Sequence, residues 1–100
     1  MNINIDKLDS NGLLNISIEG SIDTLTAQSF ENQIKESLEG CKKLILDFAK
    51  VEYVSSAGLR AILTLNTLME DQGEMIIKNI TESVRDVFEM TGFDELLTLE

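Results

Sequence analysis

The chain has 100 residues, the length of one folded domain, and 43% of them are hydrophobic, which is enough for a core. Its formal net charge of -10 would repel nucleic-acid phosphates and anionic lipid headgroups. Histidine is absent, which excludes a Ser-His-Asp triad, a Cys-His pair and a histidine metal site. We therefore expect one domain over residues 1–100, with no metal or cofactor and with neither nucleic acid nor membrane among its partners.

Cysteine usage and the length of the apolar runs indicate the compartment. Cys41 is the single cysteine, so no internal disulfide can form. No apolar run approaches the ~18 residues of a membrane-spanning helix. Residues 1–7 alternate polar and apolar side chains, unlike a secretory leader. These features predict a cytoplasmic protein.

The first forty residues predict a hairpin followed by a helix. Apolar and polar side chains alternate in residues 2–6 and again in 14–19, the pattern of two β-strands, and residues 9–12 supply turn chemistry between them. Apolar residues then recur at steps of three and four from Ala27 to Leu38. This spacing predicts an amphipathic helix that Gly40 closes.

The remainder of the chain alternates between strand and helix patterns. Residues 44–48 form a nearly continuous apolar run, typical of a central strand covered on both faces. A helix is predicted from Ser56 to Gln72, then a buried strand and a helix that stops at Gly92. Residues 97–99 are expected to form either a short edge strand or an extended tail. The predicted fold class is α/β: a small mixed β-sheet with an N-terminal antiparallel hairpin, parallel βαβ crossovers and about three main helices.

One stretch, residues 54–60, departs from ordinary helix chemistry. Ser55 or Ser56 can cap the helix that begins here. Gly58 inside the first turns costs roughly 1 kcal/mol relative to alanine, and close approach by another chain or a ligand is one explanation for it. Arg60 opposes the positive end of the helix dipole, whereas a phosphate on Ser56 would meet free amides and this arginine. The competing interpretation is a capped helix whose small residues pack against a neighbouring loop.

Three segments resemble the anti-sigma factor antagonists, small bacterial proteins that consist of a single STAS domain. The segments are Glu19–Ala27, Leu44–Phe48 with Val51, and Tyr53–Leu59. In that family the serine two residues before the glycine of the third segment is phosphorylated by an anti-sigma factor that is itself a protein kinase. The matching residue here is Ser56.

The resemblance implies a regulatory binding protein with no catalytic residues of its own. The unphosphorylated form would bind an anti-sigma factor and release a sigma factor, phosphorylation of Ser56 would switch binding off, and a partner phosphatase would reset it. Asp23 matches an aspartate close to the phosphorylation site, and it is equally a candidate N-cap of the first helix. The implied partner contacts are Asp23, Thr24, Ser55, Ser56, Ala57, Gly58 and Arg60.

One departure from the family pattern keeps alternatives open. Many members have an aspartate where this chain has Ser55, which makes Ser55 an alternative phosphate acceptor. A non-phosphorylated STAS scaffold, or an accessory subunit of a transport or signalling complex, is therefore a second hypothesis. A weak enzyme or nucleotide-binding protein that holds phosphate at the helix N-terminus is a third, although the chain lacks a Gly-x-x-x-x-Gly-Lys-Ser/Thr loop.

Overall fold

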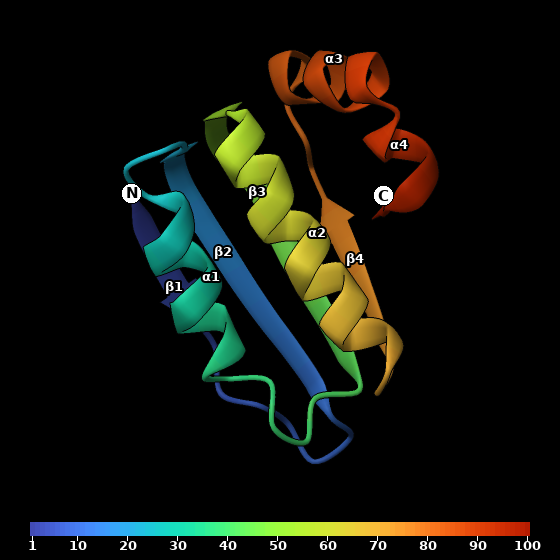
Figure 1. Ribbon diagram of the computed structural model, residues 1–100. Coiled ribbons are helices and arrows are strands. Elements are labelled where there is room, and N and C mark those ends of the chain that lie inside the picture. Colours follow the sequence, from blue (N-terminus) through green and yellow to red (C-terminus); the bar gives the residue numbers. More distant parts are fainter.

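A single mixed sheet organises the computed structural model, which describes residues 1–100. The elements are β1 (Asn2–Ile5), β2 (Leu13–Ile22), α1 (Ala27–Lys35), β3 (Lys43–Val54), α2 (Ser56–Glu70), β4 (Glu74–Lys78), α3 (Glu82–Thr91), α4 (Phe93–Leu96) and β5 (Thr98–Leu99). The strand order is β1-β2-β3-β4-β5, with β1 antiparallel to β2 and all other neighbours parallel (Figure 1). The predicted fold class is confirmed, including the hairpin, the central position of β3 and the edge strand at the C-terminus.

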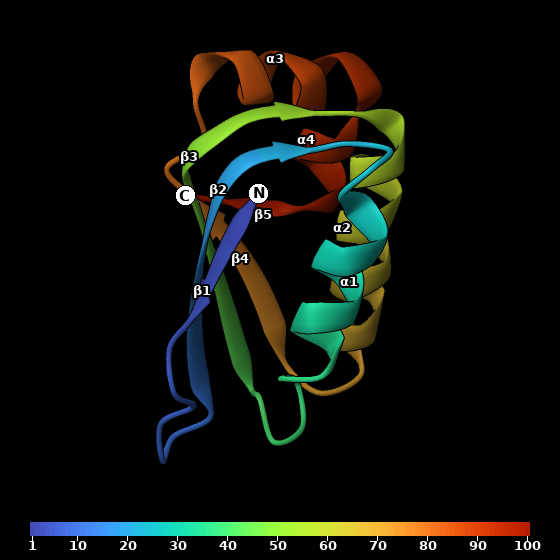
Figure 2. The ribbon, with the colours of Figure 1, turned by 90° about the vertical axis from the view of Figure 1, so that its left-hand side faces the viewer.

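Helices cover one face of the sheet. Figure 2 shows α1 and α2 against the same side, while α3 lies across the end of β3. The alternation along β2 and β3 turns Leu14, Ile16, Leu44 and Leu46 toward the helices, where they are almost fully buried. The intervening residues face the other side, which is mixed: Asn15, Ser17 and Asp47 are polar there, whereas Ile45 and Ile76 are apolar. The hydrophobic core therefore fixes α1 and α2 relative to the strands that precede them.

β2 and β3 extend beyond the segments predicted as strands. β3 has 12 residues and continues past Phe48 through the exposed Ala49 and Lys50. The pairing register with β2 shifts between Ser17 and Glu19 and again between Gly20 and Ser21, which marks irregularities where the strands bend (Figure 2). After the second shift Ile22 and Val54 are paired, so the two strands end side by side.

α1 is shorter than predicted, because the helix ends at Lys35 rather than at Gly40. The amides of Ser37 and Leu38 bond three residues back, to Ile34 and Lys35, which tightens the chain into a turn. Gln72 holds this turn, since its Nε2 lies 2.7 Å from the carbonyl oxygens of both Leu38 and Cys41. Leu38 remains buried, so the apolar periodicity continues beyond the end of the helix.

The three predicted main helices are present as α1, α2 and α3, and their ends differ from the predicted ones. α2 stops at Glu70, two residues before the predicted end. Gly92 ends α3 in the left-handed conformation, with φ 78°, as predicted for a helix-ending glycine. The four-residue α4 that follows it was not predicted. None of these helices combines the length and the hydrophobicity that crossing a membrane requires.

Candidate functional site

Two segments meet where β2 and β3 end. The amide of Ser55 donates to the carbonyl oxygen of Ile22 at 2.9 Å, which ties the start of α2 to the end of β2. The loop at residues 23–26 leads from β2 into α1, and residues 55–60 open α2. We call residues 23–26 and 55–60 together the loop–helix site. It lies at the carboxyl ends of two parallel strands, where α/β sheets usually place their functional groups.

The two serines of the site have different environments. Ser55 is the N-cap of α2, and its hydroxyl accepts from the amide of Gly58 at 3.3 Å. Ser56 is the first helical residue, and it is exposed while Ser55 is half-buried. The structure therefore assigns the capping role to Ser55 and leaves the hydroxyl of Ser56 without a protein partner.

Gly58 is buried, and the chain itself explains why no side chain is present. A Cβ there would overlap the carbonyl oxygen of Ile22 and lie 2.9 Å from Cγ1 of Val54. The sequence offers close approach by another chain or a ligand as one explanation for Gly58, which is also among the expected partner contacts. The close approach is instead between α2 and the ends of β2 and β3, and Gly58 adds no exposed surface.

Asp23 organises the loop that precedes α1. Its Oδ1 accepts from the amides of Leu25 at 3.0 Å and Thr26 at 3.2 Å, and the hydroxyl of Thr26 lies 3.1 Å from it. The N-cap of α1 is Thr26, so the prediction that Asp23 is the N-cap is wrong. Asp23 nevertheless accepts hydrogen bonds from backbone amides, as a capping residue would. The carboxylate stabilises the turn before the helix, and this turn fixes the backbone of Leu25.

A shallow groove runs from the loop onto α2. It has a volume of about 220 Å³ and is lined by Thr24, Ala27, Gln28, Glu31, Ala57, Arg60 and Ala61. Predicted contacts Thr24, Ala57 and Arg60 are therefore neighbours, whereas Gln28 and Glu31 were not predicted. Their spacing could have revealed them, because Gln28 and Glu31 stand three residues apart on one face of α1.

Arg60 forms no ion pair, although Glu31 lines the same groove. The two ion pairs of the molecule are Lys35–Glu31 and Lys43–Glu74, at 2.9 and 3.7 Å between nitrogen and oxygen. The first turn of α2 contains no acidic residue either. An exposed arginine and free amides thus share the start of this helix, an arrangement that favours an added anion.

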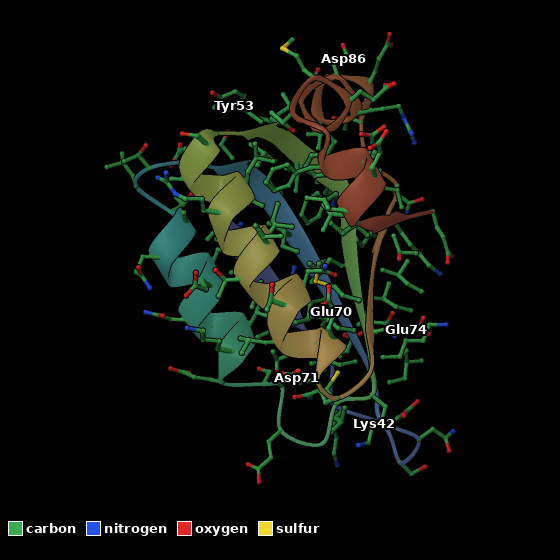
Figure 3. The ribbon with its side chains drawn as sticks, turned by 45° about the vertical axis from the view of Figure 1, so that its right-hand side comes forward. Lys42, Tyr53, Glu70, Asp71, Glu74 and Asp86 are labelled. Atoms are coloured by element: carbon green, nitrogen blue, oxygen red, sulfur yellow. The ribbon has the colours of Figure 1, made fainter.

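One exposed apolar side chain lies within the loop–helix site and another lies beside it. Leu25 is 91% exposed, and Tyr53, 52% exposed, projects from the end of β3 just before Ser55 (Figure 3). Sequence reasoning did not include either among the partner contacts. Leu25 interrupts a polar loop, which is the signal that could have identified it.

No group of three or more histidine, cysteine, aspartate and glutamate side chains is arranged to hold a metal ion.

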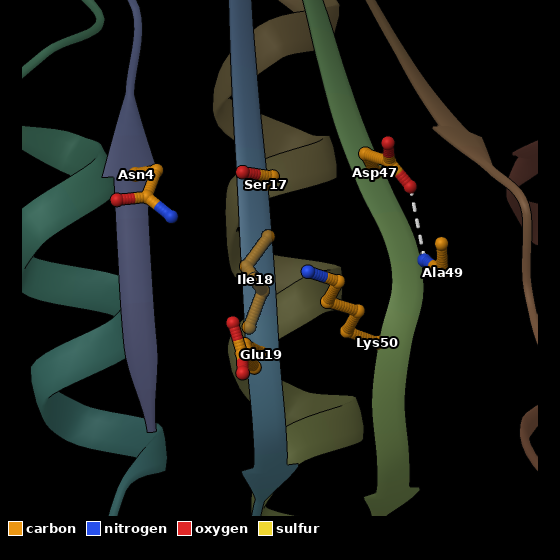
Figure 4. Close-up of a pocket in the computed structure, with 7 residues that line it drawn as sticks. All are labelled: Asn4, Ser17, Ile18, Glu19, Asp47, Ala49 and Lys50. Carbon is orange, nitrogen blue, oxygen red and sulfur yellow. Dashed lines mark hydrogen bonds between the residues drawn. The ribbon is translucent and has the colours of Figure 1, made fainter.

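A separate polar hollow of about 220 Å³ lies on the face of the sheet opposite the helices, over β1, β2 and β3 (Figure 4). Its Asp47 accepts from the amide of Ala49 at 2.9 Å and from Nδ2 of Asn79 at 3.2 Å. Burial raises the pKa of the Cys41 thiol above its ordinary value, partly offset by a backbone hydrogen bond from Lys43, at the opposite end of β3 from the site.

Comparison with known proteins agrees with this architecture. The STAS domain family matches residues 3–100. BtrV of Bordetella bronchiseptica, described as an anti-sigma factor antagonist, is 33% identical over 95 residues, covering 93% of this chain and 80% of that protein. The anti-sigma-B factor antagonist of Staphylococcus epidermidis is 25% identical, covering 97% and 92%.

Solved structures show the same fold. The anti-sigma factor antagonist SpoIIAA in its unphosphorylated form superposes with a TM-score of 0.82 at 18% identity, covering 99% of this chain and 88% of that one. The phosphorylated form of SpoIIAA from Bacillus gives 0.73 at 17% identity, covering 99% and 91%. The fold is that of a small mixed α/β domain with its helices on one face of the sheet. The chain belongs to the STAS domain family.

Proposed function

We propose that this chain is an anti-sigma factor antagonist that phosphorylation of Ser56 controls. The loop–helix site of the unphosphorylated chain binds an anti-sigma factor that is also a serine kinase, and a sigma factor is released. The kinase supplies ATP, magnesium and catalysis, the chain is its substrate, and a phosphatase resets the switch in the cytoplasm. The single observation that carries this proposal is the exposed, unpartnered hydroxyl of Ser56 at the start of α2, one turn from an arginine that forms no ion pair.

The position of Ser56 accounts for a switch that leaves the fold intact. A phosphate adds about -1.5 to -2 charges, and at the start of α2 it faces first-turn amides and Arg60 one turn away. The added charge and volume lie on exposed surface, so the core is not disturbed. A partner that closes over Ser56 would meet both, and docking would be lost.

Ser56 rather than Ser55 is the proposed acceptor because their hydroxyls differ in availability. Ser55 is half-buried, and its oxygen already accepts the capping bond from Gly58. Phosphorylation of Ser55 would require that cap to open, which removes about 0.5–2 kcal/mol of stability. Ser56 requires no such change.

The test uses four baits in host lysate: the parent chain, Ser56→Ala, Ser56→Asp and Ser83→Asp. Ser83 is an exposed serine in the first turn of α3, so Ser83→Asp adds the same charge to the start of another helix. We expect the parent, Ser56→Ala and Ser83→Asp to retain a kinase-type anti-sigma factor that Ser56→Asp does not retain. The captured kinase, purified and supplied with ATP, should phosphorylate the parent and Ser55→Ala but not Ser56→Ala.

The outcomes separate the hypotheses. If all four baits retain the same proteins, Ser56 is not a switch, and the scaffold hypothesis is preferred. If the purified kinase modifies Ser56→Ala as fast as the parent, the phosphorylation site is wrong even though the partner is right.

A further inference from the structure

Leu25 is the most exposed large hydrophobic side chain of the molecule. Its 91% exposure exceeds that of Met90 at 85%, and no other such residue is above 60%. Leu25 directly follows Thr24, which shares the groove with Ala57 and Arg60. A leucine so placed contributes nothing to the core, and its apolar surface is available to a partner that covers this site.

The turn that carries Leu25 is held by several hydrogen bonds. The amide of Leu25 donates to Oδ1 of Asp23 at 3.0 Å, and the next amide, of Thr26, donates to the same atom at 3.2 Å. The hydroxyl of Thr26 accepts from the amide of Asp23 at 2.9 Å and lies 2.8 Å from the carbonyl oxygen of Ser21. Because the turn is ordered before binding, presenting Leu25 requires little further loss of conformational freedom.

We propose that Leu25 is an apolar anchor that inserts into a pocket of the kinase-type anti-sigma factor, and that Asp23 is the positioning residue that holds it there. This inference rests on the function proposed above. A standard interface buries about 800 Å² on each partner, equivalent to a disc of roughly 16 Å radius. A partner whose active site reaches Ser56 therefore also covers the adjoining loop. A few residues near the centre of an interface, packed into fully desolvated pockets, carry most of its binding energy, and Leu25 is placed to be one of them.

The geometry distinguishes positioning by Asp23 from a direct charge contact. Its Oδ1 is committed to the turn, so the proposed role requires an acceptor at that atom rather than a negative charge. Asp23→Asn keeps an oxygen acceptor of the same shape and removes the charge. Asp23→Ala removes both.

The experiment measures the dissociation constant of the purified kinase anti-sigma factor captured with the parent bait, without ATP, by calorimetry. We expect Leu25→Ala to weaken binding by about tenfold or more, the loss typical of an interface anchor. Met90→Ala is the matched control, because Met90 is similarly exposed on α3, and it should bind within twofold of the parent. Thermal unfolding of each variant monitors the fold.

Asp23 is tested in the same assay. Asp23→Asn should bind nearly as tightly as the parent, and Asp23→Ala should bind weakly. In the double variant Asp23→Ala/Leu25→Ala, the loss of affinity should be clearly smaller than the product of the two single-variant losses, because Asp23 acts through Leu25.

Each part of the inference has an outcome that overturns it. Leu25→Ala binding within twofold of the parent contradicts the anchor, and Asp23→Asn binding as weakly as Asp23→Ala contradicts positioning. If Ser56→Asp binds as tightly as the parent while Leu25→Ala does not, the proposed switch fails and the anchor stands. If the parent chain captures no such kinase, the inference is overturned together with the proposed function.

Discussion

Two effects oppose one another at Gly58. A methyl group there would favour the helix by about 1 kcal/mol, because glycine is a poor helix former. The same group would overlap the carbonyl oxygen of Ile22, which cannot easily move because it accepts the amide of Ser55 at 2.9 Å. Overpacking of this kind costs typically 1–3 kcal/mol and occasionally more. The steric effect should dominate.

The overlap with backbone places the steric cost in the upper half of that range, about 2–3 kcal/mol. We therefore predict that Gly58→Ala destabilises the chain by about 1–2 kcal/mol net, measured as the free energy of unfolding in urea. The control is Ser56→Ala, two residues earlier in the same turn at an exposed position, which should change stability by less than about 0.5 kcal/mol. A Gly58→Ala variant at least as stable as the parent would mean that α2 can move away from β2.

No negative charge at the start of α2 compensates the positive end of the helix dipole. No acidic residue lies in its first turn, and Arg60 places a positive charge near the positive end of the helix dipole. An acidic group at position 56 would interact favourably with the helix dipole. It would also attract Arg60, because residues 56 and 60 stand four residues apart on the same helical face. Modification at this position therefore favours the helix.

From this arrangement we predict that Ser56→Asp raises the stability of the isolated chain by about 0.3–1 kcal/mol, a rise of roughly 1–6 °C in Tm by calorimetry. Ser56→Asn is the neutral control and should change Tm less. In an Arg60→Gln background the gain from Ser56→Asp should be smaller. A lower Tm for Ser56→Asp would contradict this account, and loss of partner binding could then reflect a disturbed fold.

Element ends were the least predictable part of the fold. Apolar spacing located α1, but it continued to Leu38 because the turn after the helix also packs into the core. The side chain of Gln72, more than thirty residues away, holds this turn, and no local sequence pattern predicts such a contact. In β3 the alternation fails at Ala49 and Lys50, where the strand bends and is exposed.

At the scale of the whole molecule, strand order and helix placement followed from the alternation of strand and helix patterns, since short parallel crossovers allow few arrangements. The sequence also located the start of α2 as unusual, through Gly58 and Arg60. It could not reveal which chain approaches Gly58, nor that Gln28 and Glu31 share a groove with Arg60, because those neighbours are set by packing between elements distant in sequence.

The charge of the whole molecule leads to a last prediction. The chain carries a net charge of -10 and forms only two ion pairs, each with at least one well-exposed partner. Its extents are 36 × 26 × 20 Å. At about 10 mM salt the screening length is roughly 30 Å, so acidic groups repel across most of the molecule, whereas at about 150 mM it is roughly 8 Å.

Unfolding separates these charges, so repulsion destabilises the compact state more at low salt. We predict that raising NaCl from about 10 to 150 mM increases Tm by a few degrees in calorimetry. Replacing two exposed acids, in Glu39→Lys/Glu89→Lys, reduces the net negative charge, so this variant should gain less from salt than the parent. A Tm that falls as salt is added would contradict this prediction. It would show that local attractions between charges outweigh the repulsion, so that the excess of acidic residues does not destabilise the folded chain.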